Sequence, residues 1–206
     1  MIDSPFIGIA GNIGVGKTTF TEVVAKKFNL LEVYESVADN PYLSDFYGDM
    51  KRWSFNLQIY FLHHRFSAIN NLSSYDKGMV QDRTIYEDVE IFSKNLFDMG
   101  SMDKRDWDTY SELFINMTKF LKKPDLIIYL KADLDVLLGR IKTRSRDYET
   151  TIDPDYINRL NHLYDDWISN IDGIKTITID TNNFNIFKDL DQLDDIIDRI
   201  KIALEK

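Results

Sequence analysis

Short apolar runs alternate along the chain with longer stretches in which apolar residues recur every three or four positions. The runs cover residues 5–11, 30–35, 79–83, 125–132 and 175–180. They are rich in β-branched residues and nearly continuous in hydrophobicity, which is typical of strands buried on both faces of a parallel sheet. The longer stretches predict helices at 17–28, 44–72, 84–98, 103–122, 133–145, 153–171 and 189–205. This alternation predicts an α/β fold, a doubly wound five-stranded parallel sheet flanked by helices.

The length and charge of the chain narrow its possible functions. Its 206 residues are enough for one well-packed core, so we expect a single domain over residues 1–206. The 34 Asp and Glu outnumber the 25 Lys and Arg, which gives a net charge of −9. Such a surface repels polyanions and therefore disfavours a nucleic-acid polymer or an anionic membrane as a partner. The absence of cysteine excludes disulfides, thiolate metal sites and a cysteine nucleophile.

The chain has no recognisable targeting segment. Its start, MIDSPFIGIAG, lacks both the basic and the long apolar part of a secretion signal. No run of about 18 apolar residues occurs elsewhere. We therefore expect a cytoplasmic protein.

A glycine-rich loop, GNIGVGKTT, connects the first predicted strand to the first predicted helix. Gly11 to Thr18 match the phosphate-binding pattern G-x-x-x-x-G-K-[ST]. Backbone amides and the helix N-terminus would hold the phosphates, with Lys17 at the β- and γ-phosphates and Thr18 at Mg²⁺. The alternative is a turn that only packs a helix on the sheet, but the flanking strand and helix favour a nucleotide. The residues expected to bind ATP are Gly11, Asn12, Ile13, Gly14, Val15, Gly16, Lys17, Thr18 and Thr19.

Charged residues end the second and third predicted strands, in VYESV and VQDRT. Because ligands of an open parallel sheet bind beyond the carboxyl ends of its strands, Glu35, Asp82 and Arg83 should share a rim with the loop. A carboxylate there is either a Mg²⁺ ligand or the base for a hydroxyl that attacks the γ-phosphate. An acceptor that already carried phosphate would call for positive charge instead, so Glu35 favours a neutral alcohol. The alternative for Glu35 is a solvated or capping side chain.

Three arginines lie close together in RIKTRSRDYE, residues 140–149. Arg140 and Arg144 are four residues apart and share a helix face, and Arg146 follows. We expect a closing lid at about 142–152 to use these arginines to neutralise the transferring phosphoryl group. The alternative is a surface helix whose arginines pair with Asp and Glu.

Several motifs together resemble those of the deoxynucleoside kinases, and most closely the bacterial deoxyadenosine kinases. They are GNIGVGKTT, YESV followed by NPY, FYGDMKRWSFNLQIYFLHHR, QDRTIYED and RSRDYE, in the order of that family. The resemblance implies a P-loop kinase with an arginine-rich lid. It also implies a homodimer and inhibition by a deoxynucleoside triphosphate.

The resemblance assigns roles around the reacting groups. It makes Glu35 the base that takes the proton of the 5′-hydroxyl, with Arg83 holding both. It makes Asp82 a carboxylate at the metal, although Asp82 also remains a candidate for the base. Tyr47 and Glu149 match the positions that bind the sugar 3′-hydroxyl.

The same resemblance places Gln58, Arg65, Asp88 and Phe92 around the nucleobase. Gln58 and Arg65 are seven residues apart, so two turns of one helix point both of them at one pocket. An ionised Asp88 attracts an exocyclic amine and repels the O4 of thymine. Taken singly, each residue has a structural alternative: a capping Gln58, a core Phe92 and a structural Arg65–Asp88 ion pair.

These features predict ATP- and Mg²⁺-dependent 5′-phosphorylation of deoxynucleosides, with deoxyadenosine preferred. Deoxycytidine and deoxyguanosine remain open because both carry an amine. One alternative is a nucleoside-monophosphate kinase similar to thymidylate kinase, which shares the phosphate loop and the Asp-Arg strand end. Another is a nucleotide-binding protein without catalytic activity.

Overall fold

A computed structural model describes residues 2–34, 40–72, 76–146 and 152–205. Its centre is a five-stranded sheet in the order β2-β3-β1-β4-β5, in which every neighbouring pair is parallel. The strands are β1 (Phe6–Gly11), β2 (Leu31–Val33), β3 (Met79–Asp82), β4 (Leu126–Lys131) and β5 (Lys175–Asp180). The predicted fold class is confirmed. The strand order reverses at β1, which puts the loop after β1 where ligands of such sheets bind.

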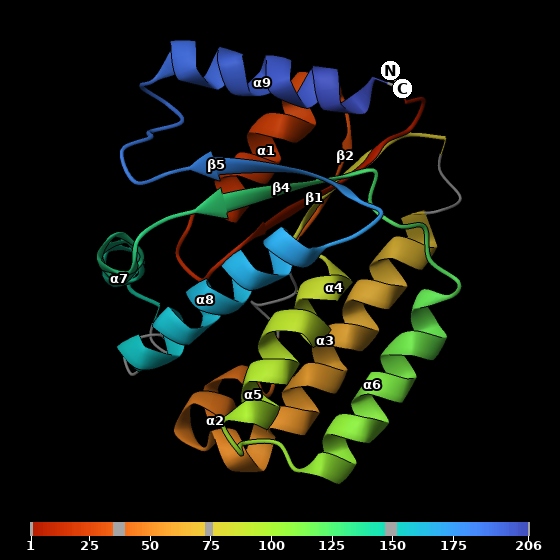
Figure 1. Ribbon diagram of the computed structural model, residues 1–206, viewed down its shortest axis with the longest axis vertical. Coiled ribbons are helices and arrows are strands. Elements are labelled where there is room, and N and C mark those ends of the chain that lie inside the picture. The colour runs from red at the N-terminus through yellow and green to blue at the C-terminus, as the bar shows by residue number, and fades with distance from the viewer. Residues whose placement is uncertain (1, 35–39, 73–75, 147–151, 206) are drawn as a thin grey trace.

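Helices cover both faces of the sheet (Figure 1). On one face lie α1 (Lys17–Phe28) and α9 (Leu190–Leu204). The opposite side carries α3 (Met50–Leu72), α6 (Lys104–Thr118), α8 (Pro154–Asn170) and the continuous segment of α4 (Ile85–Glu87), a π-helix η1 (Asp88–Ser93) and α5 (Lys94–Asp98). The two shorter helices, α2 (Leu43–Gly48) and α7 (Leu134–Arg144), lie towards the carboxyl ends of the strands.

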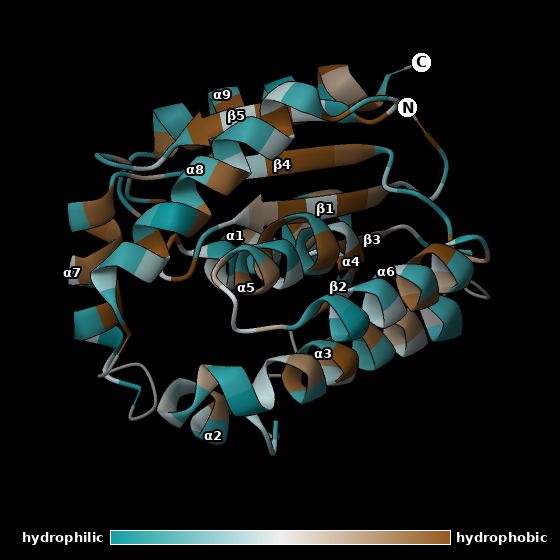
Figure 2. Cartoon of the chain, turned by 60° about the horizontal axis from the view of Figure 1, so that its bottom comes forward, coloured by the Kyte–Doolittle hydropathy of each residue, from teal (hydrophilic) through white to brown (hydrophobic). Residues whose placement is uncertain are grey.

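The central strands form the apolar core (Figure 2). Every residue of β1 is buried, and so is β4 from Leu126 to Leu130. Burial on both faces removes both sets of side chains from water, which explains the nearly continuous hydrophobicity of these runs. The edge strand β5 has one buried residue, Ile179, because helices cover it less completely.

Two of the predicted helices differ from the structure. The helix expected at 44–72 is interrupted at Asp49, which separates α2 from α3. The Asp49 carboxylate accepts a hydrogen bond from the backbone N–H of Arg52 over 3.0 Å, so it caps the start of α3. The helix expected at 84–98 contains the π-helix Asp88–Ser93, whose consequence for the site is described below.

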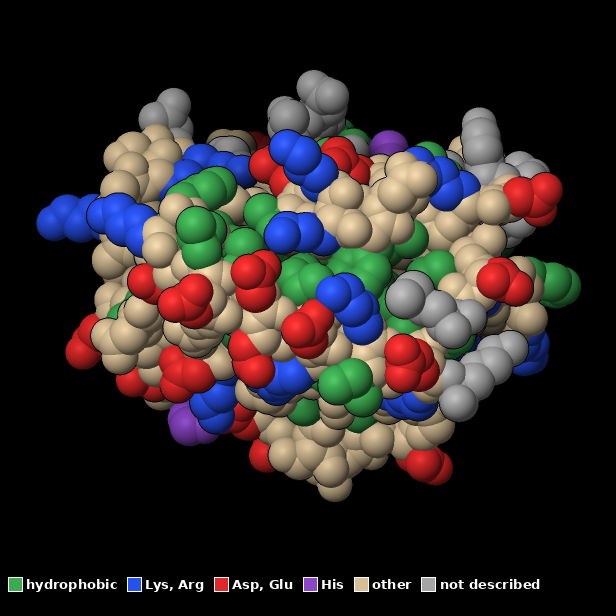
Figure 3. Space-filling view, turned by 90° about the horizontal axis from the view of Figure 1, so that it is seen from above, with side chains coloured by type: hydrophobic (Ala, Val, Ile, Leu, Met, Phe, Trp, Pro, Cys, Tyr) green, Lys and Arg blue, Asp and Glu red, His purple; other side chains and the backbone are tan. Residues whose placement is uncertain are grey.

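The face formed by α9 is acidic (Figure 3). Its exposed side chains include Asp191, Asp194, Asp195 and Asp198. Within the described ranges, no helix is both long and apolar enough to cross a lipid bilayer. Negative charge on a surface repels polyanions.

Candidate active site

The phosphate loop depends on glycine at its turns. Gly11 has φ +147°, and a Cβ there would lie 2.6 Å from the carbonyl oxygen of Leu130 on β4. Gly14 has φ +86°, and a Cβ there would lie 2.8 Å from a side-chain carbon of Ile141 on α7. Any other L residue would combine backbone strain with a steric clash at both positions. The loop is therefore packed tightly between β4 and the helix that leads into the predicted lid.

The loop ends at the positive end of α1. Gly16 is the N-cap of this helix and has no side chain with which to cap the first amides. Those amides can therefore bind an anion. The buried Lys17 ammonium donates to the carbonyl oxygens of Gly11 at 2.9 Å and Asn12 at 3.0 Å. The structure thus places Lys17 inside the loop that the sequence predicted it to serve.

Two loop residues are anchored to neighbouring elements. The Asn12 side chain donates to the Ile157 carbonyl at 2.9 Å and to the Asn161 carboxamide oxygen at 2.7 Å, both on α8. The Arg140 guanidinium donates to the Val15 carbonyl at 3.1 Å and to the hydroxyl and carbonyl of Thr181, just after β5. Arg140 thus joins the loop to the end of the sheet. Its contribution to catalysis stays a prediction.

Thr18 and Asp82 form the side of the site that suits a metal ion. The Thr18 hydroxyl donates to Oδ2 of Asp82 over 2.6 Å. Oδ1 of Asp82 is buried, and no donor among the described residues reaches it. Mg²⁺ is usually held by one or two protein oxygens together with phosphate and water, so this pair fits the ion.

Arg83 directly follows β3 and has a strained backbone conformation. Its φ is +66°, which is uncommon for a residue with a side chain. Hydrogen bonds hold it there: its N–H donates to the Ile9 carbonyl at 3.0 Å, and its carbonyl accepts from Arg65 at 3.0 Å. The turn directs the Arg83 side chain into the cavity, where the guanidinium lies 4.3 Å from the centre of the Phe92 ring. Such strain persists where a site requires it.

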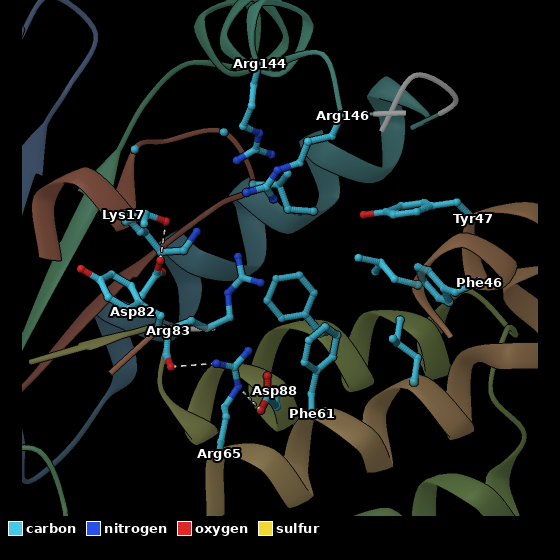
Figure 4. Close-up of a pocket in the computed structure, with 18 of the residues that line it drawn as sticks. Lys17, Phe46, Tyr47, Phe61, Arg65, Asp82, Arg83, Asp88, Arg144 and Arg146 are labelled. Carbon is cyan, nitrogen blue, oxygen red and sulfur yellow. Dashed lines mark hydrogen bonds and ion pairs between the residues drawn. The ribbon is translucent and has the colours of Figure 1, made fainter. Parts of the chain in front are cut away.

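These groups line one cavity of about 540 Å³, a usual size for a small-molecule site (Figure 4). The phosphate loop and Asp82 lie at one end, and apolar and aromatic side chains form the other. Arg144 and Arg146 point into the space between the two ends. The lining residues are Ile13, Gly14, Gly16, Lys17, Thr18, Thr19, Tyr34, Leu43, Phe46, Tyr47, Leu57, Gln58, Phe61, Arg65, Asp82, Arg83, Asp88, Phe92, Arg140, Arg144, Arg146 and Tyr156.

A few buried polar side chains line the otherwise apolar end of the cavity. Arg65 donates to Asp88 over 2.6 Å, and both side chains are almost fully buried. Ser93 donates to the side-chain oxygen of Gln58 over 3.0 Å. A ligand that enters this end therefore meets a carboxylate and a carboxamide whose positions are set by their partners.

The π-helix brings these groups to the same side. In an α-helix, residues five apart lie about 140° apart around the axis, so Asp88 and Ser93 would face different directions. Here the N–H of Lys94 donates to the carbonyl of Val89, the i→i−5 bond of a π-turn. Asp88 and Ser93 consequently both face α3, where they contact Arg65 and Gln58.

Two predicted residues, Glu35 and Glu149, lie outside the described residues, as does part of the predicted lid. The other predicted acceptor-side residues, Tyr47, Gln58, Arg65, Asp82, Arg83, Asp88 and Phe92, all line the cavity.

Sequence reasoning missed Glu87. This residue is fully buried between the phosphate loop and Arg83, and its carboxylate accepts a hydrogen bond from the backbone N–H of Gly11 over 3.3 Å. A signal for it exists in the sequence: Thr84 and Glu87 form the Thr-x-x-Glu pattern of a capping box, and the structure contains both of its hydrogen bonds.

A second cavity of about 240 Å³ lies on the other side of the phosphate loop. It is lined by Gly16, Thr19, Arg140 and the segment from Phe184 to Phe187, among others. Thr19 and Arg140 line both cavities, so the two spaces meet at the loop.

A phosphate loop that faces a pocket of apolar and a few polar side chains, with arginines over the gap, is the arrangement of a kinase that phosphorylates a small molecule. Residues 7–205 match the deoxynucleoside kinase family. The chain belongs to this family and is therefore a phosphotransferase. This finding confirms the predicted family and weighs against the monophosphate-kinase alternative.

Individual relatives cover most of the chain. It is 39% identical over 196 residues to a deoxyadenosine/deoxycytidine kinase of Bacillus subtilis, with 94% of this chain and 90% of the relative covered. It is 40% identical over 196 residues to a deoxyadenosine kinase of Dictyostelium discoideum, with 95% and 79% covered. A solved structure of a deoxyadenosine kinase from M. mycoides with bound dATP superposes with a TM-score of 0.82 at 28% identity, covering 94% of this chain and 99% of the other.

Proposed function

We propose that this enzyme transfers the γ-phosphoryl group of ATP to the 5′-hydroxyl of deoxynucleosides and prefers deoxyadenosine. The observation that carries the proposal is that the larger of the two cavities has the phosphate loop at one end and the Gln58–Asp88 pocket at the other. A nucleoside bound with its base in that pocket would direct its sugar towards the phosphates. The space between the ends is where Arg144 and Arg146 lie, and their charge would stabilise the transferring group.

The proposed acceptor chemistry requires a base and a group that orients the hydroxyl. Glu35 follows β2 by two residues and is assigned as the base on sequence grounds. Arg83, whose turn directs its side chain into the cavity, is assigned to hold the 5′-oxygen. Tyr47 lines the opposite wall and is assigned, together with Glu149, to the sugar 3′-hydroxyl.

Thr18 and Asp82 are the residues assigned to Mg²⁺. When bound, the ion would neutralise negative charge on the β- and γ-phosphates. A carboxylate already hydrogen-bonded to Thr18 is well placed for this task, and the proposal keeps Glu35 as the base.

The second cavity is a suitable place for the base of ATP. The triphosphate must follow the loop, so the donor base lies on the side of the loop away from the acceptor. Arg140 is anchored at that position by Val15 and Thr181. Its guanidinium can stack on an aromatic base, a contact that guanidinium groups commonly make.

The proposed selection of deoxyadenosine and deoxycytidine over thymidine rests on Asp88. A buried carboxylate next to the base accepts a hydrogen bond from an amine and repels a carbonyl oxygen. Adenine and cytosine both present an amine beside a ring nitrogen that can accept from Gln58. The relatives named for deoxyadenosine and deoxycytidine support this assignment.

A phosphate-transfer assay over deoxyadenosine, deoxycytidine, deoxyguanosine and thymidine, with labelled ATP and Mg²⁺, tests the proposal. We expect the highest kcat/KM with deoxyadenosine and the lowest with thymidine. The same assay with dAMP tests the acceptor class, and phosphorylation of dAMP in preference to deoxyadenosine would overturn the proposal.

The proposal extends to a homodimer in the cytoplasm, where ATP is available. Exposed apolar side chains on and just beyond α6, those of Leu113, Ile115 and Phe120, support self-association. Sedimentation analysis at micromolar concentration would distinguish a dimer from a monomer.

A further inference from the structure

A buried carboxylate that has no assigned role lies between the two ends of the active site. Glu87 is fully buried and sits between Arg83 and Asp88 in the sequence. The proposed chemistry uses both of those neighbours but not Glu87. Carboxylates are rarely buried unless their hydrogen bonds and charge are matched, so the partners of Glu87 indicate what it does.

Glu87 joins three segments of the chain. Its Oε1 accepts from the backbone N–H of Gly11 at 3.3 Å and from the hydroxyl of Tyr164 at 2.8 Å. Its Oε2 accepts from the backbone N–H of Thr84 at 2.7 Å and from the Thr84 hydroxyl at 3.2 Å. The partners thus belong to the start of the phosphate loop, to the turn after β3 and to α8.

The charge of Glu87 is matched to the cations of the site. Oε1 lies 3.9 Å from Nε of Arg83. Burial raises the pKa of Glu87, whereas Arg83, the Thr84 amide, Lys17 and Tyr164 act in the opposite direction. The Arg83 side chain is therefore held between the carboxylate and the Phe92 ring, which lies 4.3 Å from the guanidinium carbon.

A helix cap alone does not explain this arrangement. A capping box needs only the contacts between Oε2 and Thr84. The contacts of Oε1 are to Gly11, Tyr164 and Arg83, and none of these serves to cap α4. They connect the donor side of the site to the acceptor side.

We propose that Glu87 is a positioning residue that holds the first peptide of the phosphate loop and the Arg83 side chain in one fixed relation. The inference rests on the proposed function, because it assigns Arg83 to the acceptor hydroxyl and the loop to ATP. Phosphoryl transfer needs the attacking and leaving oxygens in line, so catalysis depends on this relation. Glu87 acts through Arg83 and the loop without touching either substrate.

The test is Glu87→Gln, which keeps the size of the side chain and removes its charge. The amide NH₂ must then face the N–H of either Gly11 or Thr84, and the ion pair with Arg83 is lost. We expect kcat to fall by about 10- to 100-fold and each KM to change by less than about threefold. Tyr164→Phe is the matched control: it removes one hydrogen bond from the same carboxylate but keeps its charge, and should retain kcat within about threefold.

Two further measurements distinguish the proposed positioning role of Glu87 from a purely structural one. Binding stoichiometry with a non-hydrolysable ATP analogue gives the concentration of folded sites, and kcat is expressed per site. A double-mutant cycle with Arg83→Lys then tests whether Glu87 acts through Arg83. If it does, Glu87→Gln lowers kcat by less than about threefold when Arg83 is already replaced by Lys. If its full effect persists there, or if kcat per site equals the wild-type value, the inference is overturned.

Glu87→Asp serves as a second variant should Glu87→Gln not fold. It keeps the charge but draws the carboxylate back by one methylene, so it cannot reach both Gly11 and Thr84, and kcat should fall by about tenfold. Wild-type kcat in Glu87→Asp would overturn the inference. A wild-type enzyme that phosphorylates no deoxynucleoside would instead refute the proposed function.

Discussion

The Thr18 hydroxyl and the Asp82 carboxylate meet over 2.6 Å, although they are 64 residues apart in the chain. The contact joins the start of α1 to the end of β3 and thereby brings the phosphate loop next to the acceptor side. Both side chains offer oxygen ligands of the kind that Mg²⁺ prefers. The pair therefore defines where the proposed metal ion binds relative to the phosphates.

Asp82→Asn should lower kcat by about 10²-fold or more and raise the Mg²⁺ concentration needed for half-maximal rate, because a neutral amide binds the ion poorly. The measurement is initial rate against free Mg²⁺ at saturating ATP and deoxyadenosine. Thr18→Ser, which keeps the hydroxyl, is the control and should behave like the wild type. An unchanged Mg²⁺ requirement in Asp82→Asn would instead assign Asp82 to proton transfer.

Glu35→Gln should lower kcat by roughly 10²–10⁴-fold, because the 5′-hydroxyl then lacks its base. Binding of deoxyadenosine, measured calorimetrically, should remain close to that of the wild type because the base pocket is unchanged. Turnover near the wild-type rate would indicate that Asp82 or solvent acts as the base instead.

Asp88→Ala should relax the selection against thymidine. Without the carboxylate, the O4 of thymine no longer faces a negative charge, and the ratio of kcat/KM for thymidine to that for deoxyadenosine should rise by about tenfold or more. Direct competition between the two nucleosides measures this ratio. An unchanged ratio would refute the base-pocket assignment.

Asp88→Ala also leaves the buried Arg65 without its carboxylate, which can destabilise the fold by about 3–5 kcal/mol. Asp88→Asn is the matched variant because its oxygen can still accept from Arg65 while its NH₂ can donate to thymine. It should shift the ratio in the same direction with a smaller loss of thermal stability.

Arg144→Ala should impair catalysis, whereas Arg140→Ala should impair stability and ATP binding. Arg144 points into the space between the two ends of the cavity, so its removal should lower kcat by about 10²–10³-fold. Arg140 donates to Val15 and Thr181, so its removal should destabilise the fold by about 1–3 kcal/mol and weaken ATP binding. Melting curves and kinetics on both variants would reveal the difference, and the reverse pattern would contradict these assignments.

Local patterns made much of the site predictable from the sequence. The spacing of Gly11, Gly16 and Lys17 specifies a phosphate loop because backbone geometry there depends on a few neighbouring residues. Asp82 and Arg83 could be placed at the same rim because the carboxyl ends of parallel strands meet at one edge of a sheet.

Other features depend on contacts between distant segments. The contacts of Glu87 with Gly11 and Tyr164 were not predictable because those residues are 76 and 77 positions away from it. Asp49 interrupts an otherwise helical pattern, and the capping bond to Arg52 competes there with helix continuation. A π-turn of six residues is too short to produce a hydrophobic periodicity different from that of an α-helix. The pattern at 84–98 therefore predicts a helix but not the π-turn within it.

The contacts of Asp88 and Ser93 with α3 depend on the irregular backbone of the π-turn. If the segment from Ile85 to Asp98 kept its length but became an uninterrupted α-helix, Ser93 would lie about 140° around the axis from Asp88 and would lose its contact with Gln58. Removing one residue, such as the exposed Glu90, would instead put Ser93 four positions after Asp88, about 40° around an α-helix, so both side chains would still face α3. The irregularity thus accommodates one additional residue between two side chains that contact the same neighbouring helix.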